Sequence, residues 1–344
     1  AITDKEKGVW GLDQVYNKIN QGSIWSYTTN QNELWTWGEN EYGELAQNDR
    51  THRSSPVQIP GTNWARVGIR DNKVGGVKTD GTLWMWGRNE YGMLGQNNQT
   101  LYSSPVQVPG TTWSSDWGKL AGTAYAVTGA IKTDGTLWIW GYNAKGQLGQ
   151  NNTTNYSSPK QIPGTTWATI SAAGGFVMAS KTDGTLWTWG SNAYGSLGMN
   201  NNTLANTRYS SPVQVGTDAT WSTSYNQLCT NPSHSVATIK TDGTLWTWGR
   251  NQHGELGQNN KTQYSSPKQV GSATDWYTVQ TRHQCMIARK TDNTFWVWGE
   301  NEKGSLGQNN QTQYSSPIQV PGFTAGEFSS VGVNKDGFSV LKQL

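Results

Sequence analysis

The sequence predicts an all-β protein, a β-propeller of four-stranded antiparallel blades around a central axis. Three observations support this class. A tryptophan-rich motif recurs along the chain, Asp-Gly turns separate runs that are typical of strands, and the 344 residues include 41 glycines and 20 tryptophans. This composition favours turn-rich β structure over a helical bundle. Seven hairpin copies predict a seven-bladed propeller, with six blades as the alternative.

The repeated motif is Leu-Trp-x-Trp-Gly, which occurs five times and is followed by a sixth copy that begins with phenylalanine. The second tryptophans of successive copies are 49, 54, 49, 59 and 50 residues apart. Residues at i and i+2 of a strand point to the same face, so we predict that each tryptophan pair packs between neighbouring sheets. The twelve structural tryptophans are Trp35, Trp37, Trp84, Trp86, Trp138, Trp140, Trp187, Trp189, Trp246, Trp248, Trp296 and Trp298.

Each repeat has the pattern of four short strands. In the second repeat the expected strands cover residues 64–69, 73–78, 82–87 and 105–108, and Asp80-Gly81 joins the second strand to the third. Asp-Gly is a strong hairpin signal because both central positions of the tight turn require a positive φ. Repetition of this unit over the whole chain predicts a single propeller with protected sheet edges.

The two ends of the chain are expected to meet in one blade. A degenerate seventh copy at residues 335–340 includes Asp336-Gly337 and lacks a fourth strand. The N-terminal segment is expected to complete it, so residues 24–344 form one propeller closed between the N-terminal and C-terminal segments. Residues 1–23 are expected to be a separate docking arm, with Trp10, Leu12 and Tyr16 as its contact residues.

Composition and motifs argue against several functions. The formal net charge of +3 is too small to indicate a nucleic-acid partner. No apolar run approaches the roughly 20 residues of a membrane span, so no membrane insertion is expected. The chain has no zinc-ligand pair, serine elbow or phosphate loop, so we expect no enzyme activity, no metal and no cofactor. Cys229 and Cys285 are expected to be buried thiols, with one disulfide as the alternative.

The two longest repeats carry insertions, which in repeat proteins map to loops and often to the binding face. Exposed tryptophan, arginine and tyrosine residues are typical of binding hot spots. Ordinary loop variation is the alternative interpretation of these insertions. The candidate binding residues are Trp117, Arg208, Tyr209, Tyr225 and His234.

The spacing of the repeat resembles the regulator-of-chromosome-condensation repeat family. In that family a turn Asp-Gly is followed by Trp-Gly-x-Asn-x-x-Gly-x-Leu-Gly and a Pro-x-x-Val strand, as in residues 80–108 here. The resemblance implies a seven-bladed propeller and leaves the function open. Members include exchange factors for a small GTPase, a plant UV-B photoreceptor and a β-lactamase inhibitor. The photoreceptor motif Gly-Trp-Arg-His-Thr is absent here, and an exchange-factor role is the least favoured.

The N-terminal segment Gly8–Tyr16 is similar to short leaders on bacteriophage tail and virion proteins. This similarity predicts a non-enzymatic virion structural or attachment protein, located in the virion, with other virion proteins or a host-surface receptor as partners. The alternative is a secreted or surface binding module, either a protein inhibitor or a lectin that binds a glycan. Aromatic and amide side chains suit sugar stacking and hydroxyl recognition.

Overall fold

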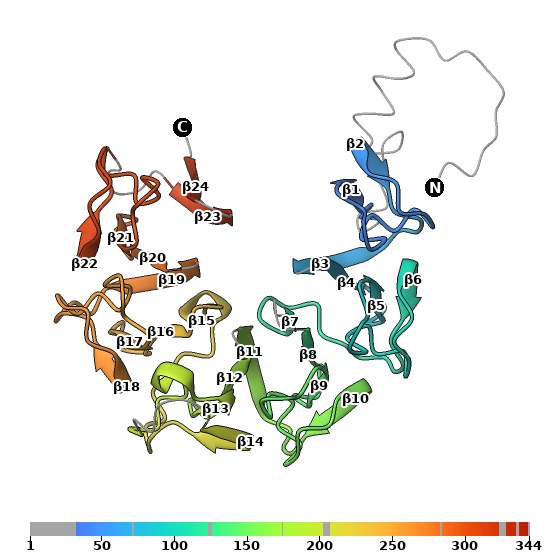
Figure 1. Cartoon of the computed structure of the whole chain (residues 1–344), viewed down its shortest axis with the longest axis horizontal. Coiled ribbons are helices and arrows are strands. Elements are labelled where there is room, and N and C mark those ends of the chain that lie inside the picture. The colour runs from blue at the N-terminus through green and yellow to red at the C-terminus, as the bar shows by residue number, and fades with distance from the viewer. Residues whose placement is uncertain are drawn as a thin grey trace, which may run out of the picture.

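The computed structural model describes residues 32–70, 72–122, 126–173, 175–201, 207–282, 284–322, 328–334 and 337–342. Within these ranges the regular structure consists of β-strands and two short 3₁₀ turns, η1 (Ala193–Gly195) and η2 (Tyr225–Gln227). The strands form five four-stranded sheets and two two-stranded sheets, which are arranged around a central axis (Figure 1). The predicted β-propeller class is therefore confirmed.

Each four-stranded sheet consists of four consecutive antiparallel strands. The five sheets comprise β3 (Trp64–Arg70), β4 (Lys73–Lys78), β5 (Leu83–Gly87) and β6 (Tyr102–Gln107); β7 (Leu120–Gly122), β8 (Val127–Ile131), β9 (Leu137–Gly141) and β10 (Tyr156–Ile162); β11 (Trp167–Ala173), β12 (Phe176–Lys181), β13 (Leu186–Ser191) and β14 (Arg208–Gln214); β15 (Leu228–Thr230), β16 (Ser235–Ile239), β17 (Leu245–Gly249) and β18 (Tyr264–Gln269); β19 (Trp276–Arg282), β20 (Cys285–Lys290), β21 (Phe295–Gly299) and β22 (Tyr314–Gln319). The two-stranded sheets comprise β1 (Trp35–Gly38) with β2 (Arg53–Gln58) and β23 (Phe328–Asn334) with β24 (Gly337–Lys342).

The first strand of each four-stranded sheet lies nearest the axis and the fourth lies at the rim (Figure 1). The predicted turns join the second and third strands. In the first of these sheets Asp80-Gly81 connects β4 to β5, and Gly81 has a φ of 76°. Only residues that tolerate the left-handed region suit this position, which explains the recurrence of glycine there and of Asn293 in the last turn.

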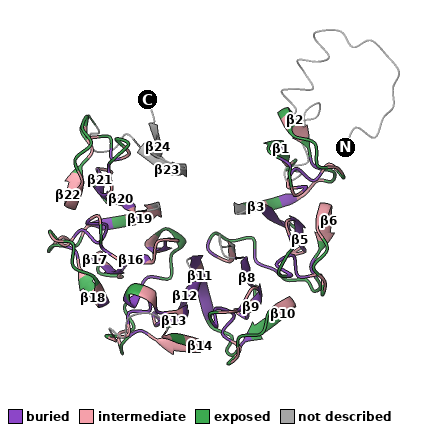
Figure 2. Ribbon diagram, viewed as in Figure 1, coloured by how far each residue is buried: buried purple, intermediate pink, exposed green. Residues whose placement is uncertain are grey.

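The second tryptophan of each pair joins two neighbouring sheets. In each four-stranded sheet its indole is fully buried, and the Nε1 atom donates to a backbone carbonyl in the long loop of the preceding sheet at 2.8–2.9 Å. The donor and acceptor pairs are Trp86 and Glu44, Trp140 and Met93, Trp189 and Gln147, Trp248 and Ser196, and Trp298 and Glu255. Buried residues concentrate on the inner and middle strands, as Figure 2 shows. These five indoles therefore pack at the junctions between neighbouring sheets.

In the five four-stranded sheets, the first tryptophan of each pair packs on a lysine. In the sheet of β11–β14, the Nζ atom of Lys181 lies 4.1 Å from the ring centre of Trp187 and 4.9 Å from that of Trp167. The arrangement recurs in all five four-stranded sheets, so each sheet holds one ammonium group between two indoles. Such cation–π contacts contribute about 0.5–2 kcal/mol each.

The first tryptophan pair departs from this arrangement. Trp35 and Trp37 are 48% and 61% exposed, although they were predicted to pack like the other five pairs. Both lie on β1, which among the described strands pairs with β2 alone. The physical reason for their exposure is that no sheet in the described part of the chain covers the other edge of β1.

The turn Asp336-Gly337 does not have the position that the sequence predicts. Asn334 pairs with Gly337, so the connection lies between β23 and β24, which correspond to the first and second strands of a blade. The final repeat therefore supplies only two strands, and β1 with β2 supplies the third and fourth strands of a blade. The chain contains five complete blades and a sixth divided between its ends, so six is the correct count and seven is wrong.

Candidate binding site

Insertions shorten two of the strands beside the axis. β7 and β15 have three residues each, whereas β3, β11 and β19 have seven. The tryptophan that starts a regular inner strand is retained in both cases as an isolated bridge, which pairs Trp113 with Lys132 and Trp221 with Lys240. The residues that follow, 114–119 and 222–227, form two equivalent loops beside the axis.

The two loops share a local structure. The Ser114 hydroxyl accepts from the backbone N–H of Asp116 at 3.2 Å, and the Ser222 hydroxyl accepts from that of Ser224 at 3.0 Å. Each loop then places an aromatic residue four positions after its tryptophan, so Trp117 and Tyr225 are equivalent. Hydroxyl-to-backbone bonds of this kind stabilise tight turns and fix the direction of the following side chain.

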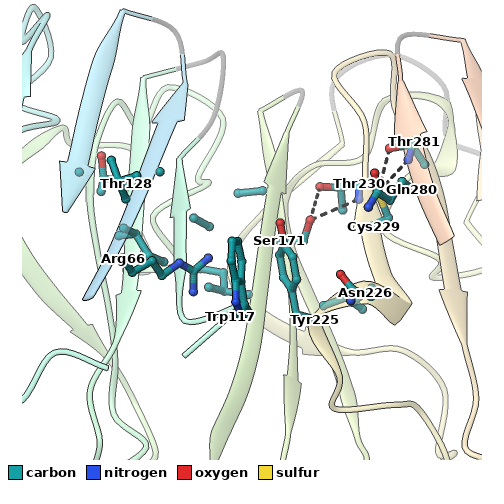
Figure 3. Close-up of a pocket in the computed structure, with 18 of the residues that line it drawn as sticks. Arg66, Trp117, Thr128, Ser171, Tyr225, Asn226, Cys229, Thr230, Gln280 and Thr281 are labelled. Atoms are coloured by element: carbon teal, nitrogen blue, oxygen red, sulfur yellow. Dashed lines mark hydrogen bonds between the residues drawn. The ribbon is translucent and has the colours of Figure 1, made fainter. Parts of the chain in front are cut away.

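Trp117 and Tyr225 face each other beside the axis, as Figure 3 shows. Their ring centres are 5.8 Å apart with an interplanar angle of 32°, and the side chains are 69% and 40% exposed. Gly118 permits this approach because a Cβ atom at that position would lie 3.0 Å from the Cβ of Tyr225. The structure thus brings together two of the five predicted binding residues.

Arg66 on β3 completes one side of this arrangement. Its Cζ atom lies 4.6 Å from the ring centre of Trp117 and 5.9 Å from that of Tyr225. Its Nη1 atom donates to the carbonyl of Asp116, which attaches the first loop to β3. Burial against the rings lowers the pKa of Arg66 from its ordinary value, yet an arginine remains charged at neutral pH.

Tyr277 and Arg289 extend the arrangement across the next sheet. The Cζ atom of Arg289 lies 4.7 Å from the ring centre of Tyr277, whose side chain is exposed. Gln227, at the end of the second loop, donates from Nε2 to the carbonyl of Tyr277 at 2.8 Å. We call Arg66, Trp117, Tyr225, Tyr277 and Arg289 the aromatic–arginine cluster.

The cluster borders a cavity of about 610 Å³ on the axis, which is lined by residues of all five four-stranded sheets. Its volume is in the range of ordinary ligand pockets. Ser171 and Thr230 share a hydroxyl hydrogen bond of 2.9 Å in its wall, and the Cys229 thiol contacts the Thr281 hydroxyl at 3.0 Å. The described lining residues include Arg66, Lys73 and Arg289.

The two cysteines are not joined in a disulfide. Cys229 and Cys285 both remain thiols, so the alternative disulfide does not form here. Among the described residues, no three His, Cys, Asp or Glu side chains gather in a group that could hold a metal ion. The described part of the chain also has no helix of the length and apolarity needed to cross a membrane.

Arg208 and Tyr209 lie away from the cluster, on the rim strand β14 (Figure 1). Arg208 donates to the carbonyl of Ala144 at 3.2 Å, and the Tyr209 hydroxyl accepts from Asn201 at 3.3 Å. Tyr209 also packs, partly buried, against a cluster that contains Trp248. These contacts give both residues structural roles at the rim.

His234 is a turn residue rather than part of the cluster. It follows β15, whereas Tyr225 precedes it, and it has a left-handed φ of 71°. Its ring stacks on Phe176 at 5.9 Å and lies 5.5 Å from Tyr194. Burial, with a smaller contribution from the charge of Arg250, lowers the pKa of His234 to about 4, so the ring is neutral at pH 7.

Sequence reasoning did not identify three of the cluster residues, Arg66, Tyr277 and Arg289, because they occupy regular strand positions. Tyr277 stands where Ala65 and Ala168 stand in other repeats, and Arg289 stands where Ile239 stands. Departure from the repeat at a regular position of the first or second strand is the signal that could have identified them. The predicted docking residues Trp10, Leu12 and Tyr16 lie outside the described residues.

The fold and the repeated indole contacts define a β-propeller of the kind built from tandem repeats of about fifty residues. A sequence profile for the "Regulator of chromosome condensation (RCC1) repeat" matches residues 31–68, 80–114, 134–180, 183–223, 242–280 and 292–333. These segments cover most of the chain. The chain belongs to the regulator of chromosome condensation repeat family.

Solved structures agree with this assignment at the level of the fold. Human WBSCR16 superposes with a TM-score of 0.73 at 18% identity and covers 90% of this chain and 81% of its own. Prp20p from Saccharomyces cerevisiae, described with its binding properties to Gsp1p and histones, superposes with a TM-score of 0.73 at 17% identity and covers 91% and 79%. Yeast RCC1 (Prp20) bound to Kap60 gives a TM-score of 0.73 at 18% identity, with 91% and 77% covered.

Proposed function

We propose that the protein is a non-catalytic platform that binds another protein at the aromatic–arginine cluster. The observation that carries this proposal is the pairing of Trp117 with Tyr225, two exposed aromatic side chains held in place by equivalent loops. Tryptophan, tyrosine and arginine are the residues most enriched in the energetic centres of protein interfaces. Their exposure in a rigid ring argues for recognition of a partner.

The rigidity of the scaffold supports binding rather than chemistry. Both loops are attached to neighbouring inner strands, through Arg66 on one side and Gln227 on the other. A site that is ordered before the partner arrives loses less conformational entropy on binding. The structural neighbours Prp20p and yeast RCC1, which are described with protein partners, favour the same class of function.

A photo-crosslinking experiment tests the platform. The photoreactive residue benzoylphenylalanine replaces Trp117, and the full-length protein is irradiated in its source culture. We expect one discrete adduct with a partner protein, and we expect Trp117→Ala with Tyr225→Ala to abolish co-purification of that partner.

Tyr91 provides the matched control because it is an exposed aromatic residue outside the cluster, and its ring packs against Tyr142 with the ring centres 4.7 Å apart. Benzoylphenylalanine at position 91 should not capture the same partner. Equal capture from both positions, or no adduct from position 117, would show that the cluster is not the binding surface.

We propose as a second, finer possibility that the partner is a component of a virus particle or a receptor on its host. The observation that favours it is the leader-like segment Gly8–Tyr16. Mass spectrometry of gradient-purified particles should detect the protein, and deletion of residues 1–23 should prevent its incorporation. Normal incorporation of the truncated chain would refute the docking arm, and absence from the particles would refute the virion role.

A secreted or surface protein inhibitor would use the same cluster, so the identity of the cross-linked partner distinguishes it from a virion protein. A lectin would instead bind sugars through its aromatic rings. Strong hits for the full-length chain on a glycan array, lost in Trp117→Ala, would favour the lectin over the protein-binding platform.

A further inference from the structure

The cavity on the axis has a wall of neutral polar side chains, which we call the polar wall. It consists of Ser171 on β11, Asn226 on η2, Thr230 on β15 and Thr278 on β19, so three consecutive blades contribute. Figure 3 shows Ser171, Thr230 and Asn226 beside Tyr225. Hydroxyl and amide groups in such positions fix the orientation of a small molecule in a pocket.

Two residues of the polar wall have unused hydrogen-bonding capacity. The Asn226 side chain is exposed and Thr278 is half-buried, and neither side chain makes a hydrogen bond with the described part of the chain. An amide offers two donor hydrogens and an acceptor oxygen, and a hydroxyl offers one donor and two lone pairs. Because both residues already line the cavity and are accessible, a ligand reaches them without displacement of another group.

The other two residues of the polar wall retain one donor between them. The Ser171 and Thr230 hydroxyls share a hydrogen bond of 2.9 Å, and the Ser171 hydroxyl also accepts from the backbone N–H of Thr230 at 3.3 Å. Whichever hydroxyl donates to the other, the second hydroxyl hydrogen stays available. The polar wall therefore offers both donors and acceptors, which suits a ligand whose own groups donate and accept.

An aromatic ring lies next to the polar wall. Tyr225 is 40% exposed and directly precedes Asn226 in η2. A sugar combines an apolar C–H face, which packs on an aromatic ring, with hydroxyls that donate and accept around its own ring. An extended peptide presents its hydrogen-bonding groups along one line, whereas the polar wall is spread over three blades around a cavity. A sugar therefore matches this arrangement better than a peptide does.

We propose that the cavity binds a saccharide, held through its hydroxyl groups by Asn226 and Thr278 and packed on the ring of Tyr225. The volume of about 610 Å³ is in the range of pockets that enclose small ligands. This inference goes beyond the protein-binding platform, because it assigns a ligand to the cavity rather than to the exposed rings. A free sugar and a glycan attached to another molecule present the same hydroxyl chemistry, and the test separates these two sources.

The probe is an array of neutral hexose and N-acetylhexosamine oligosaccharides, with sialylated glycans as an acidic comparison. We expect the labelled full-length protein to bind at least one neutral glycan, and calorimetry to detect binding of the same sugar free in solution. Thr278→Val keeps the side-chain shape and removes the hydroxyl, so it should weaken this binding by about three- to tenfold, and Asn226→Ala should have a similar effect. Binding of the array glycan without binding of the free sugar would support the site with an attached glycan as its ligand.

Thr169→Val is the matched control, because Thr169 has the position in β11 that Thr278 has in β19. Its hydroxyl bonds to Ser180 at 2.7 Å inside the sheet, so this variant should bind the glycan like the unaltered protein. Thermal unfolding of each variant shows whether its fold is retained. Absence of any neutral hit, unchanged binding in both Thr278→Val and Asn226→Ala, or the same loss in Thr169→Val would overturn the saccharide site. Hits confined to sialylated glycans would also overturn it, because charge would then direct the binding.

The two proposals fail in different ways. Capture of a protein from position 117 without any glycan hit would leave the platform in place and overturn the saccharide. Glycan binding that depends on Thr278, without any captured protein, would retain the saccharide site and overturn the platform. Hits that are lost in Trp117→Ala and kept in Thr278→Val would place the sugar on the exposed rings and overturn the site in the cavity.

Discussion

A chain of three polar groups follows the hairpin turn between the second and third strands of each four-stranded sheet. In the sheet of β11–β14, Trp187 Nε1 donates to the Thr185 hydroxyl at 2.9 Å, and that hydroxyl donates to the Asp183 carboxylate at 2.7 Å. The hydroxyl and the backbone N–H of Thr185 both stabilise the carboxylate, which lowers the pKa of Asp183. In the segment Asp-Gly-Thr-x-Trp, the threonine hydroxyl therefore connects the turn to the first indole of the pair. The sequence alone did not reveal this role of the threonine.

Thr185→Val removes the middle group of this chain and keeps the side-chain shape. We expect the free energy of unfolding to fall by about 1 kcal/mol, because the Trp187 N–H and the Asp183 carboxylate lose a shared partner. Thr182→Val is the matched control in the same turn, since Thr182 is exposed. Urea titration of both variants measures the difference, and equal losses would show that the hydroxyl contributes nothing.

His234 makes stability depend on pH. Its pKa is about 4 in the folded protein and near 6.5 in an unfolded chain, so the unfolded state binds more protons between these values. Stability from the neutral buried ring is fully present above about pH 6.5 and declines as pH falls toward 4. Between about pH 8 and about pH 5 this residue should remove about 2 kcal/mol of stability.

His234→Asn is the informative variant because asparagine tolerates the left-handed φ of this turn, as Asn72 does at the equivalent position. Urea titrations at about pH 5 and about pH 8 should show a smaller loss for the variant than for the unaltered protein. An identical loss in both would mean that other groups produce the pH dependence.

At the scale of elements, the strands and their order were predictable because the turns and the alternating indoles recur with fixed spacing. β4 and β5, for example, fall within a residue or two of their expected positions. The two loops of the candidate site were predictable only as insertions. Their equivalence depends on the serine turns after Trp113 and Trp221, and their contacts with Arg66 and Tyr277 depend on packing between blades that no local pattern specifies.

Gly118→Ala tests whether the two loops act as one element. Gly118 has a φ of +85°, and an added Cβ would meet Tyr225 at 3.0 Å. Gly216→Ala is the matched control, with a φ of +62° and no atom within 4 Å of the added Cβ. Both variants should lose about 1 kcal/mol from backbone strain, and Gly118→Ala should lose at least about 1 kcal/mol more from crowding.

Gly118→Ala should also weaken binding of the proposed protein partner, because the added Cβ displaces Tyr225 beside Trp117. Urea titration and co-purification of the partner measure the two effects on the same variants. Equal stability of the two alanine variants, with unchanged binding in both, would mean that the loops are independent of each other.

For the whole molecule, one contact between sheets recurs five times and is missing at the sixth junction. Glu44, Met93, Gln147, Ser196 and Glu255 each precede a buried leucine and accept from the indole of the next sheet. Ser305 precedes Leu306 in the same way, and its counterpart in the repeat order is the exposed Trp37. The count of seven blades was wrong because a local Asp-Gly signal does not say which pair of strands it joins.

The missing contact predicts how the ring closes. A Cβ atom at Gly254 would meet Ser315 of the next sheet. One at Gly304 would have only the Asn310 carbonyl at 4.0 Å, so no described strand of a following sheet lies against Gly304. The register of β12 with β13 pairs Ser180 with Leu186. By the same register we predict that β24 pairs with β1, with Leu341 opposite Leu34, in one four-stranded sixth blade.

A crystal structure of the full-length chain tests this closure most directly through the distance from Trp37 Nε1 to the Ser305 carbonyl oxygen. Our account predicts a hydrogen bond of the length found at the other five junctions, 2.8–2.9 Å, with Trp37 buried. An exposed Trp37, with β1 and β24 apart or paired with strands of another chain, would contradict a closed six-bladed ring.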